Sequence, residues 1–114
     1  MELGSVETGL QSNPLTTAVD LIGSALISPN RLSQPYAWIE HIPFAFWIVA
    51  QHKPRVLVEL GTQTGNSYLA FCQAVARFGL STRCFAVDTW RGDEHAGLYG
   101  EEVYQALSDY HDKY

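Results

Sequence analysis

Apolar positions recur at helical spacing early in the chain. Four of them lie three or four residues apart and define one face of a helix: Leu15, Val19, Ile22 and Leu26. Asn13-Pro14 is typical of a helix start, with asparagine as the N-cap and proline at the first helical position. Ser28-Pro29 is expected to end this helix, because proline cannot continue one.

A second helix is predicted over residues 37–51, with Pro43 as a candidate break. The segment is apolar nearly all round, which is typical of a helix that is buried or that covers a partner surface. A parallel sheet needs helices on both faces, so a cover packed on a sheet is favoured over a substrate pocket or a dimer surface. The aromatic residues of this cover are Trp38, Phe44, Phe46 and Trp47.

Two short runs of apolar residues, 55–60 and 82–88, do not alternate with polar residues. Such runs are typical of strands that are buried on both faces of a parallel sheet. Between them, a helical spacing begins at Asn66 and closes at Phe78-Gly79, where glycine is the usual C-terminal stop. Residues 101–114 have the spacing of an amphipathic helix.

This order of elements predicts an α/β protein. N-terminal helices precede a strand, a helix, a second strand and a last helix, so right-handed crossovers and parallel strands are expected. The chain is predicted to divide into a flexible tail (1–12), an N-terminal helical cap (13–54) and a strand–helix–strand–helix part (55–114).

Charge and composition exclude several classes of function. The 114 residues carry a net charge of −5 and no run of Lys or Arg, which argues against nucleic acid or an anionic membrane as the main partner. No signal-peptide pattern opens the chain, and the apolar segment before residue 52 is too polar to span a bilayer. Cys72 and Cys84 are interpreted as reduced core residues of a cytoplasmic protein.

The junction between the first strand and the next helix carries the candidate chemistry. The strand ends at Glu59, and a polar turn with Gly61 and Gly65 leads into the helix. Ligands of parallel α/β sheets bind outside the carboxyl ends of the strands, where the glycines allow close backbone approach. The N-terminus of the following helix offers unpaired N–H groups to a carboxylate or phosphate.

The second strand ends at Asp88, about 20 residues beyond the glycine turn. A carboxylate at this position can accept hydrogen bonds from both hydroxyls of a ribose. The turn reads G-x-x-x-G, whereas a dinucleotide fingerprint reads G-x-G-x-x-G. Glu59 would repel a pyrophosphate, and it suits a ligand with a positive amino group.

At these residues the sequence resembles the class I S-adenosylmethionine-dependent methyltransferases, because "VELGTQTGNSY" and "AVDTW" are similar to their first and second motifs. The resemblance implies a Rossmann-like fold, of which residues 55–114 would be the first half. It implies that Asp88 holds the ribose, that Thr89 and Trp90 lie beside the adenine, and that the turn faces the amino-acid end. The implied residues of the turn are Glu59, Gly61, Thr62, Gln63, Thr64, Gly65, Asn66 and Ser67.

A longer stretch, from "YAWIEHIPFAFWIV" to "FAVDTWRGDEHAGLYGEEVY", looks like a bacterial branch related to macrocin O-methyltransferases. This branch is often found with glycosyltransferases in glycan or antibiotic biosynthesis, which implies O-methylation of a sugar or natural-product hydroxyl. The match covers residues 36–108 and only the first part of the family's domain. We therefore expect a fragment that has little or no activity alone, and the catalytic base and any metal dependence stay unassigned.

The segment "RGDEHAGLYG" holds Asp93, Glu94 and His95, which are potential metal ligands or acid–base groups. Three adjacent residues rarely point at one ion, so a solvated loop over the cofactor is favoured over His95 as a base, and no metal site is assigned.

Two other classes of function stay open. One is a noncatalytic interaction module, and the other is a nucleotide-binding oxidoreductase half-domain, which the missing third glycine and Glu59 disfavour. A homodimer through the aromatic helix or an open sheet edge is also considered.

Overall fold

The structure is a computed structural model that describes residues 22–113. The predicted tail and the predicted helix start at Asn13-Pro14 lie outside these residues. Residues 22–24 are helical, and the turn that follows ends before Ser28-Pro29, as expected. Ile22 and Leu26 are 64% and 79% exposed, so no described element covers their apolar face.

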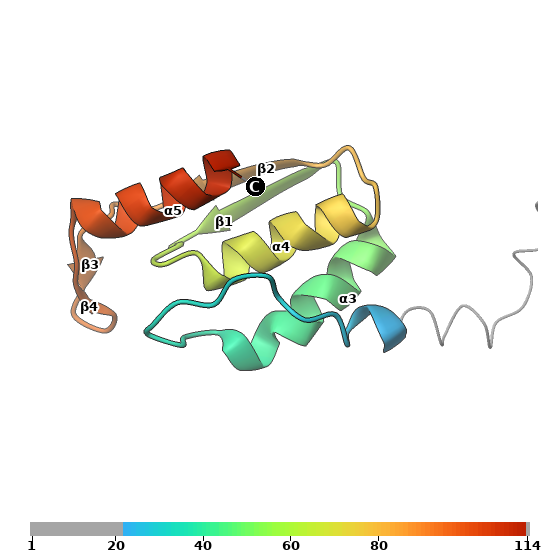
Figure 1. Ribbon diagram of the computed structural model, residues 1–114, viewed down its shortest axis with the longest axis horizontal. Helices are drawn as coiled ribbons and strands as arrows, with labels where there is room; N and C mark the ends of the chain where they lie inside the picture. Colours follow the sequence, from blue (N-terminus) through green and yellow to red (C-terminus); the bar gives the residue numbers. More distant parts are fainter. Residues whose placement is uncertain (1–21, 114) are drawn as a thin grey trace, which may run out of the picture.

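The order of elements predicted from the sequence is confirmed within the described residues (Figure 1). The elements are η1 (Ile39–His41), α3 (Ile42–His52), β1 (Val56–Leu60), α4 (Asn66–Arg77), β2 (Arg83–Val87), β3 (Gly92–Asp93), β4 (Gly97–Leu98) and α5 (Glu101–Lys113). Pro43 lies in the first turn of α3, where the missing N–H is tolerated. The β3–β4 hairpin was not predicted. No helix among the described residues is long and apolar enough to cross a membrane.

Strands β1 and β2 pair in parallel, with Val58 opposite Phe85 and Leu60 opposite Val87. Helix α4 connects them, as the crossover rule requires. It ends where predicted, because Gly79 adopts a φ of +64° just after the last turn. The parallel pairing brings the carboxyl ends of both strands to the same edge.

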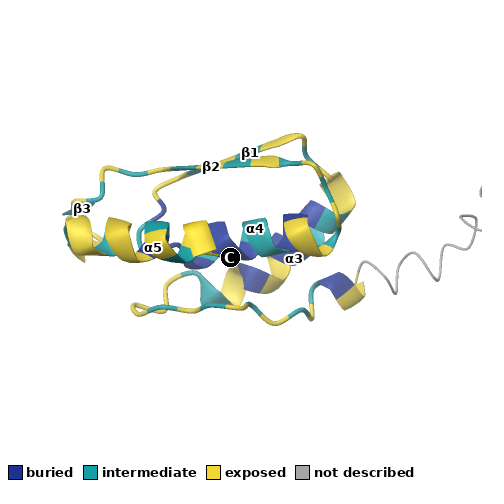
Figure 2. Cartoon of the chain, turned by 45° about the horizontal axis from the view of Figure 1, so that its top comes forward, coloured by how far each residue is buried: buried dark blue, intermediate teal, exposed yellow. Residues whose placement is uncertain are grey.

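The prediction that both faces of the strands are buried is wrong. Helices α3, α4 and α5 lie on the same side of β1 and β2 (Figure 2). Leu57 and Cys84 face this helical side and are half-buried, whereas Val58 and Phe85 on the opposite face are 54% and 41% exposed. An unbroken apolar run means that both faces of a strand can be buried. Among the described residues, however, helices cover only one face of β1 and β2.

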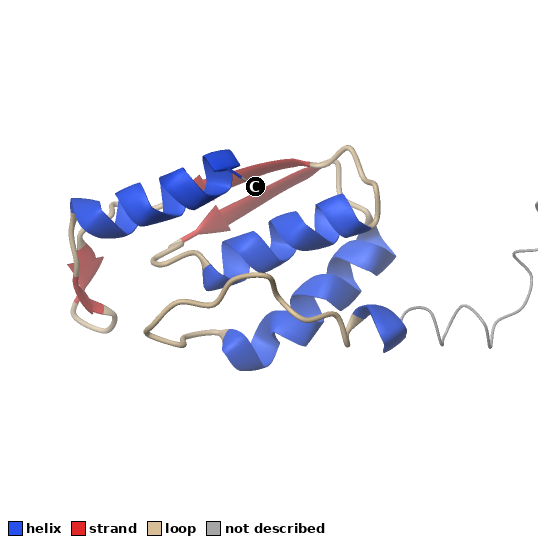
Figure 3. Cartoon of the chain, viewed as in Figure 1, coloured by secondary structure: helices blue, strands red, loops and turns tan. Residues whose placement is uncertain are grey.

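Helix α3 packs on α4 to form the main core (Figure 3). Phe46 and Val49 of α3 are 0% and 1% exposed. The facing positions of α4 include Ala70 and Ala74, whose small side chains allow the two helices to approach closely. The aromatic segment was interpreted as a cover packed on the sheet, but Phe46 is buried in the core that α3 forms with α4, and Phe44 points outward and is 51% exposed.

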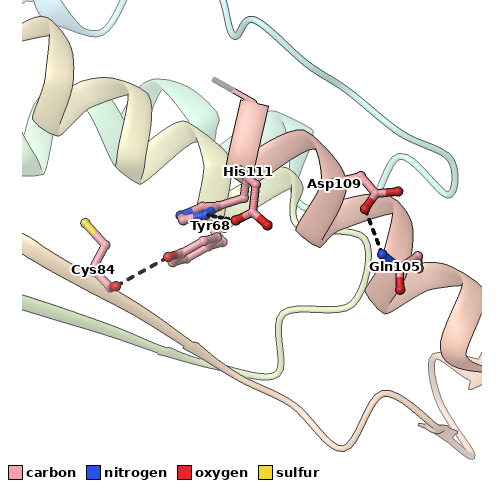
Figure 4. Close-up of polar contacts among 6 residues, drawn as sticks. Tyr68, Cys84, Gln105, Asp109 and His111 are labelled. Atoms are coloured by element: carbon pink, nitrogen blue, oxygen red, sulfur yellow. Dashed lines mark hydrogen bonds and ion pairs between the residues drawn. The ribbon is translucent and has the colours of Figure 1, made fainter.

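A second, smaller core joins α5 to α4 and β2. Leu107 of α5 is 5% exposed and packs with Tyr68 and Leu69 of α4. Tyr68 donates a hydrogen bond from its hydroxyl to the carbonyl of Cys84 at 3.4 Å, and its ring stacks on His111 at 5.9 Å (Figure 4).

The thiols of Cys72 and Cys84 are free, as predicted, and half-buried rather than fully enclosed. Burial raises the pKa of the Cys72 thiol to about 12, so this side chain is a neutral packing group.

Replacing Phe46 by alanine should lower the free energy of unfolding by about 3–5 kcal/mol, because it leaves a cavity between α3 and α4. The matched variant Phe44→Ala removes the same side chain from an exposed position and should change it by less than about 1 kcal/mol. Urea denaturation followed by circular dichroism measures both. Equal losses would contradict the assigned core.

Candidate functional site

The turn between β1 and α4 is set by two glycines in the left-handed region. Gly61 has a φ of +83° and donates its N–H to the carbonyl of Val87 at 2.8 Å, which joins the turn to the end of β2. Gly65 has a φ of +89° and immediately precedes α4. A side chain at Gly65 would also meet the end of the Leu107 side chain, so a larger residue here would force Leu107 of α5 to shift.

Asp88 joins the glycine turn to the loop after β2. Its Oδ2 accepts the N–H of Gln63 at 2.8 Å, and its Oδ1 accepts the N–H of Trp90 at 2.7 Å. Both donors lie in the left-handed region, with φ of +50° at Gln63 and +60° at Trp90. Such conformations are unfavourable for residues with side chains, and the shared carboxylate compensates for them.

The electrostatics of Asp88 follow from these contacts. Burial acts to raise its pKa, but hydrogen bonds from the backbone of Gln63 and Trp90 and from the Tyr99 hydroxyl outweigh burial and lower it. The carboxylate is therefore ionised at neutral pH and presents acceptor oxygens at the carboxyl edge of the sheet.

Two cavities flank the glycine turn. The Asp88 cavity, of about 420 Å³, is lined by Asp88, Gly61, Gln63, Thr89 and Tyr99, among others. The Trp38 cavity, of about 190 Å³, lies against the same turn and is lined by the following residues, among others: Trp38, Gly61, Thr62, Gln63, Thr64, Asn66 and Ser67.

The structure thus brings most residues of the predicted site to one edge. Trp90 is the exception, because its ring packs on Tyr104 at 5.2 Å and lines a separate surface pocket. It contributes its backbone N–H to Asp88 and does not line the Asp88 cavity.

Glu59 lies on the helix-covered face of β1, close to the glycine turn. Burial raises the pKa of its carboxyl group, while the nearby hydroxyl of Ser67 partly offsets this effect. Within residues 22–113, no donor meets Glu59 Oε1 in hydrogen-bond geometry, and Thr62 Oγ1 also lacks a partner. Buried polar atoms without partners are rare in folded proteins and indicate a place where a ligand or water completes the bonding.

Asn66 fastens the loop before η1 to the glycine turn. Its Nδ2 donates to the carbonyl of Ser33 at 2.9 Å, and its Oδ1 accepts the N–H of Ser33 at 2.8 Å. Arg31 Nη1 adds a hydrogen bond to the carbonyl of Thr64 at 2.9 Å. These contacts hold the loop that leads to Trp38 against the turn. The residue spacing gave no signal of them, because they join side chains to backbone groups far apart in the chain.

The residues Asp93, Glu94 and His95 do not converge on a common point. Asp93 Oδ1 accepts the N–H groups of His95 and Ala96 at 2.8 and 2.7 Å, so this carboxylate caps the hairpin turn. All three side chains are exposed, and no group of three His, Cys, Asp or Glu residues among those described is placed to hold a metal ion.

Sequence reasoning missed Tyr99, which follows this hairpin and contacts Asp88. Its only sequence signal is a tyrosine among the glycines that end the loop.

Comparisons with known proteins fit this geometry. Residues 58–113 match the family described as "Methyltransferase domain", a range that begins within β1 and ends with α5. Over 94 residues, which are 82% of the chain, the sequence is 54% identical to the uncharacterized protein y4gI of Sinorhizobium fredii (strain NBRC 101917 / NGR234).

The chain spans 10% of the length of that relative. No solved structure matches the chain significantly. The parallel β1–β2 pair with its intervening helix is an α/β architecture, and together with the match it is consistent with a partial Rossmann-like methyltransferase fold.

Replacing Glu59 by glutamine should stabilise the chain at pH 7. A raised pKa in the folded state means that ionised Glu59 is disfavoured there, so the destabilisation is absent below the ordinary value of 4.5 and grows as the pH rises above it. The difference in denaturation midpoint between Glu59→Gln and wild type should therefore shrink from pH 7 to pH 4. Glu40→Gln, at an exposed position, is the control. A less stable Glu59→Gln variant at pH 7 would contradict this assignment.

Proposed function

We propose that this segment binds S-adenosylmethionine at the edge where β1 and β2 end. The observation that carries the proposal is the ionised Asp88 carboxylate, which is hydrogen-bonded to the glycine turn and lines, with that turn, a cavity of about 420 Å³. In a parallel sheet this is the edge at which ligands bind, and a carboxylate at the second strand suits a ribose. The match of residues 58–113 to a methyltransferase domain supports this choice of cofactor.

The residues present fit the amino-acid end of the cofactor. Glu59 is a partly buried carboxylate whose Oε1 lacks a donor, and a ligand ammonium group would supply one. Thr62 Oγ1 could complete its bonding in the same way. The N-terminus of α4, preceded by Gly65, offers backbone N–H groups to the ligand carboxylate.

At the nucleoside end, Asp88 would accept the ribose hydroxyls and Thr89 would lie beside the adenine. The expectation that Trp90 also lies beside the adenine is wrong, because its ring packs on Tyr104 and only its backbone N–H reaches Asp88. When bound, S-adenosylmethionine supplies an electrophilic methyl group, and the residues of this chain hold and orient it.

The acceptor is proposed to be a hydroxyl of a sugar, in a glycan or a natural product. This choice rests on the resemblance of residues 36–108 to one bacterial branch of methyltransferases. His95 is exposed on the hairpin and belongs to neither cavity, so it is not proposed as the base.

Two alternatives are kept as outcomes of the tests. An oxidoreductase half-domain would prefer NAD to S-adenosylmethionine. An interaction module would use the aromatic surface from Trp38 to Trp47, a homodimer would use that helix or the open sheet edge, and neither would bind a nucleoside.

Calorimetric titration with S-adenosylhomocysteine should show binding that is weakened at least tenfold in Asp88→Ala, because both ribose hydroxyls lose their acceptor. Asp88→Asn retains one acceptor oxygen. It tests the role of the carboxylate in ribose binding if the alanine substitution disrupts the glycine turn. Asp109→Ala removes an exposed carboxylate on α5 and should bind like wild type. Tighter binding of NAD, or no loss in either Asp88 variant, would overturn the proposal.

Methyl transfer by the 114-residue chain to sugar acceptors should stay at background, because one edge of two strands offers only part of a doubly wound ligand site. A radiometric assay with labelled S-adenosylmethionine measures this. Sustained turnover would contradict the view that this segment binds the cofactor without completing catalysis.

A further inference from the structure

Tyr99 directly follows the β3–β4 hairpin in the chain, and its side chain contacts the carboxylate of Asp88. Its hydroxyl lies 3.3 Å from Oδ1 and 3.3 Å from Oδ2, so it donates across the edge between the two oxygens. Burial raises the pKa of the phenol, and the charge of Asp88 and this hydrogen bond raise it further. The phenol is therefore a neutral donor at physiological pH.

The turn of the β3–β4 hairpin positions Tyr99 beside Asp88. Gly92 has a φ of +84°, and a side chain there would collide with the backbone of Gly97. Asp93 caps the turn through the N–H groups of His95 and Ala96. The N–H of Tyr99 then donates to the carbonyl of Arg91 at 3.2 Å. This hydrogen bond joins the end of the hairpin to its start, close to the end of β2.

The acceptor positions of Asp88 are nearly all engaged. Each carboxylate oxygen accepts one short hydrogen bond from a backbone N–H, of Gln63 or of Trp90. A carboxylate has about four lone-pair positions, so roughly one remains on each oxygen. Tyr99 engages both of these with one hydroxyl, through longer contacts than the backbone bonds.

A vicinal diol needs the same two positions, with one hydroxyl on each oxygen. We propose that Tyr99 is an internal competitor for the diol site: its hydroxyl occupies the edge of Asp88 that a ribose would take, and a ribonucleoside must displace it to bind. The inference rests on the proposed use of Asp88 for ribose and adds the group that the ligand replaces.

The surroundings permit this exchange. Tyr99 lines the Asp88 cavity, and Gly92 and Ala96 beside it have small side chains or none. The phenol is partly exposed, so it can turn to water when it leaves the carboxylate. The two long contacts are replaced by two hydroxyl–carboxylate bonds, which are among the stronger kinds.

The test compares wild type with Tyr99→Phe, which keeps the ring and removes the competing hydroxyl. Titrations with adenosine and S-adenosylhomocysteine should show about three- to tenfold tighter binding to Tyr99→Phe, the effect of losing one competing hydrogen bond. Binding of 2′,3′-dideoxyadenosine, which lacks the diol, should not change. Tyr36→Phe, at a position 55% exposed in the loop before η1, is the matched control and should bind like wild type.

A second measurement uses wild type alone. With tyrosines labelled at the ring carbon that bears the hydroxyl, the NMR signal that disappears in Tyr99→Phe should move on saturation with adenosine and stay in place with the dideoxy compound. The signal of Tyr36 should not move.

The outcomes separate this inference from the proposed cofactor. Equal or weaker binding of adenosine to Tyr99→Phe, or an equal gain for the dideoxy compound, would overturn the inference even if S-adenosylhomocysteine binds well. A gain in affinity confined to diol ligands supports the inference about Tyr99. That inference would stand even if S-adenosylhomocysteine bound no better than adenosine, whereas this result would overturn the cofactor proposal. Failure of wild type and Tyr99→Phe to bind any ribonucleoside would overturn both.

Discussion

The carboxylate of Asp88 holds three separate pieces of backbone in register. It accepts one N–H from the glycine turn and one from the loop after β2, and a hydroxyl from the residue that ends the β3–β4 hairpin. Gln63 and Trp90 adopt left-handed conformations that would be unfavourable without this acceptor. The shape of the carboxyl edge, and with it the candidate ligand site, depends on the ionised carboxylate of Asp88.

The regular elements could be predicted from the sequence because local signals determine them. The apolar runs that became β1 and β2, the glycine that ends α4 at Gly79 and the periodicity of α5 all act over a few residues. The junction at Glu59 and the position of Asp88 followed from the same reasoning, since parallel pairing must bring two strand ends to one edge.

Features that depend on distant partners could not be read in this way. The apolar run in β1 predicts burial of both faces, but Val58 faces solvent because cover depends on elements elsewhere in the fold. Asn66 is an ordinary helix-start residue in the sequence, and its bonds to the loop at Ser33 come from tertiary packing. Tyr99 was missed because two-residue strands give no periodicity, and its path back to Asp88 depends on a turn capped by Asp93.

The most direct test of the central claim, that Asp88 is the ribose acceptor of this fold, is a crystal structure of the chain with S-adenosylhomocysteine. The account predicts that the two ribose hydroxyls lie within hydrogen-bond distance of the two oxygens of Asp88, with the Tyr99 hydroxyl displaced from that edge. S-adenosylhomocysteine bound with its ribose away from Asp88, and with the contact between Tyr99 and Asp88 unchanged, would contradict it.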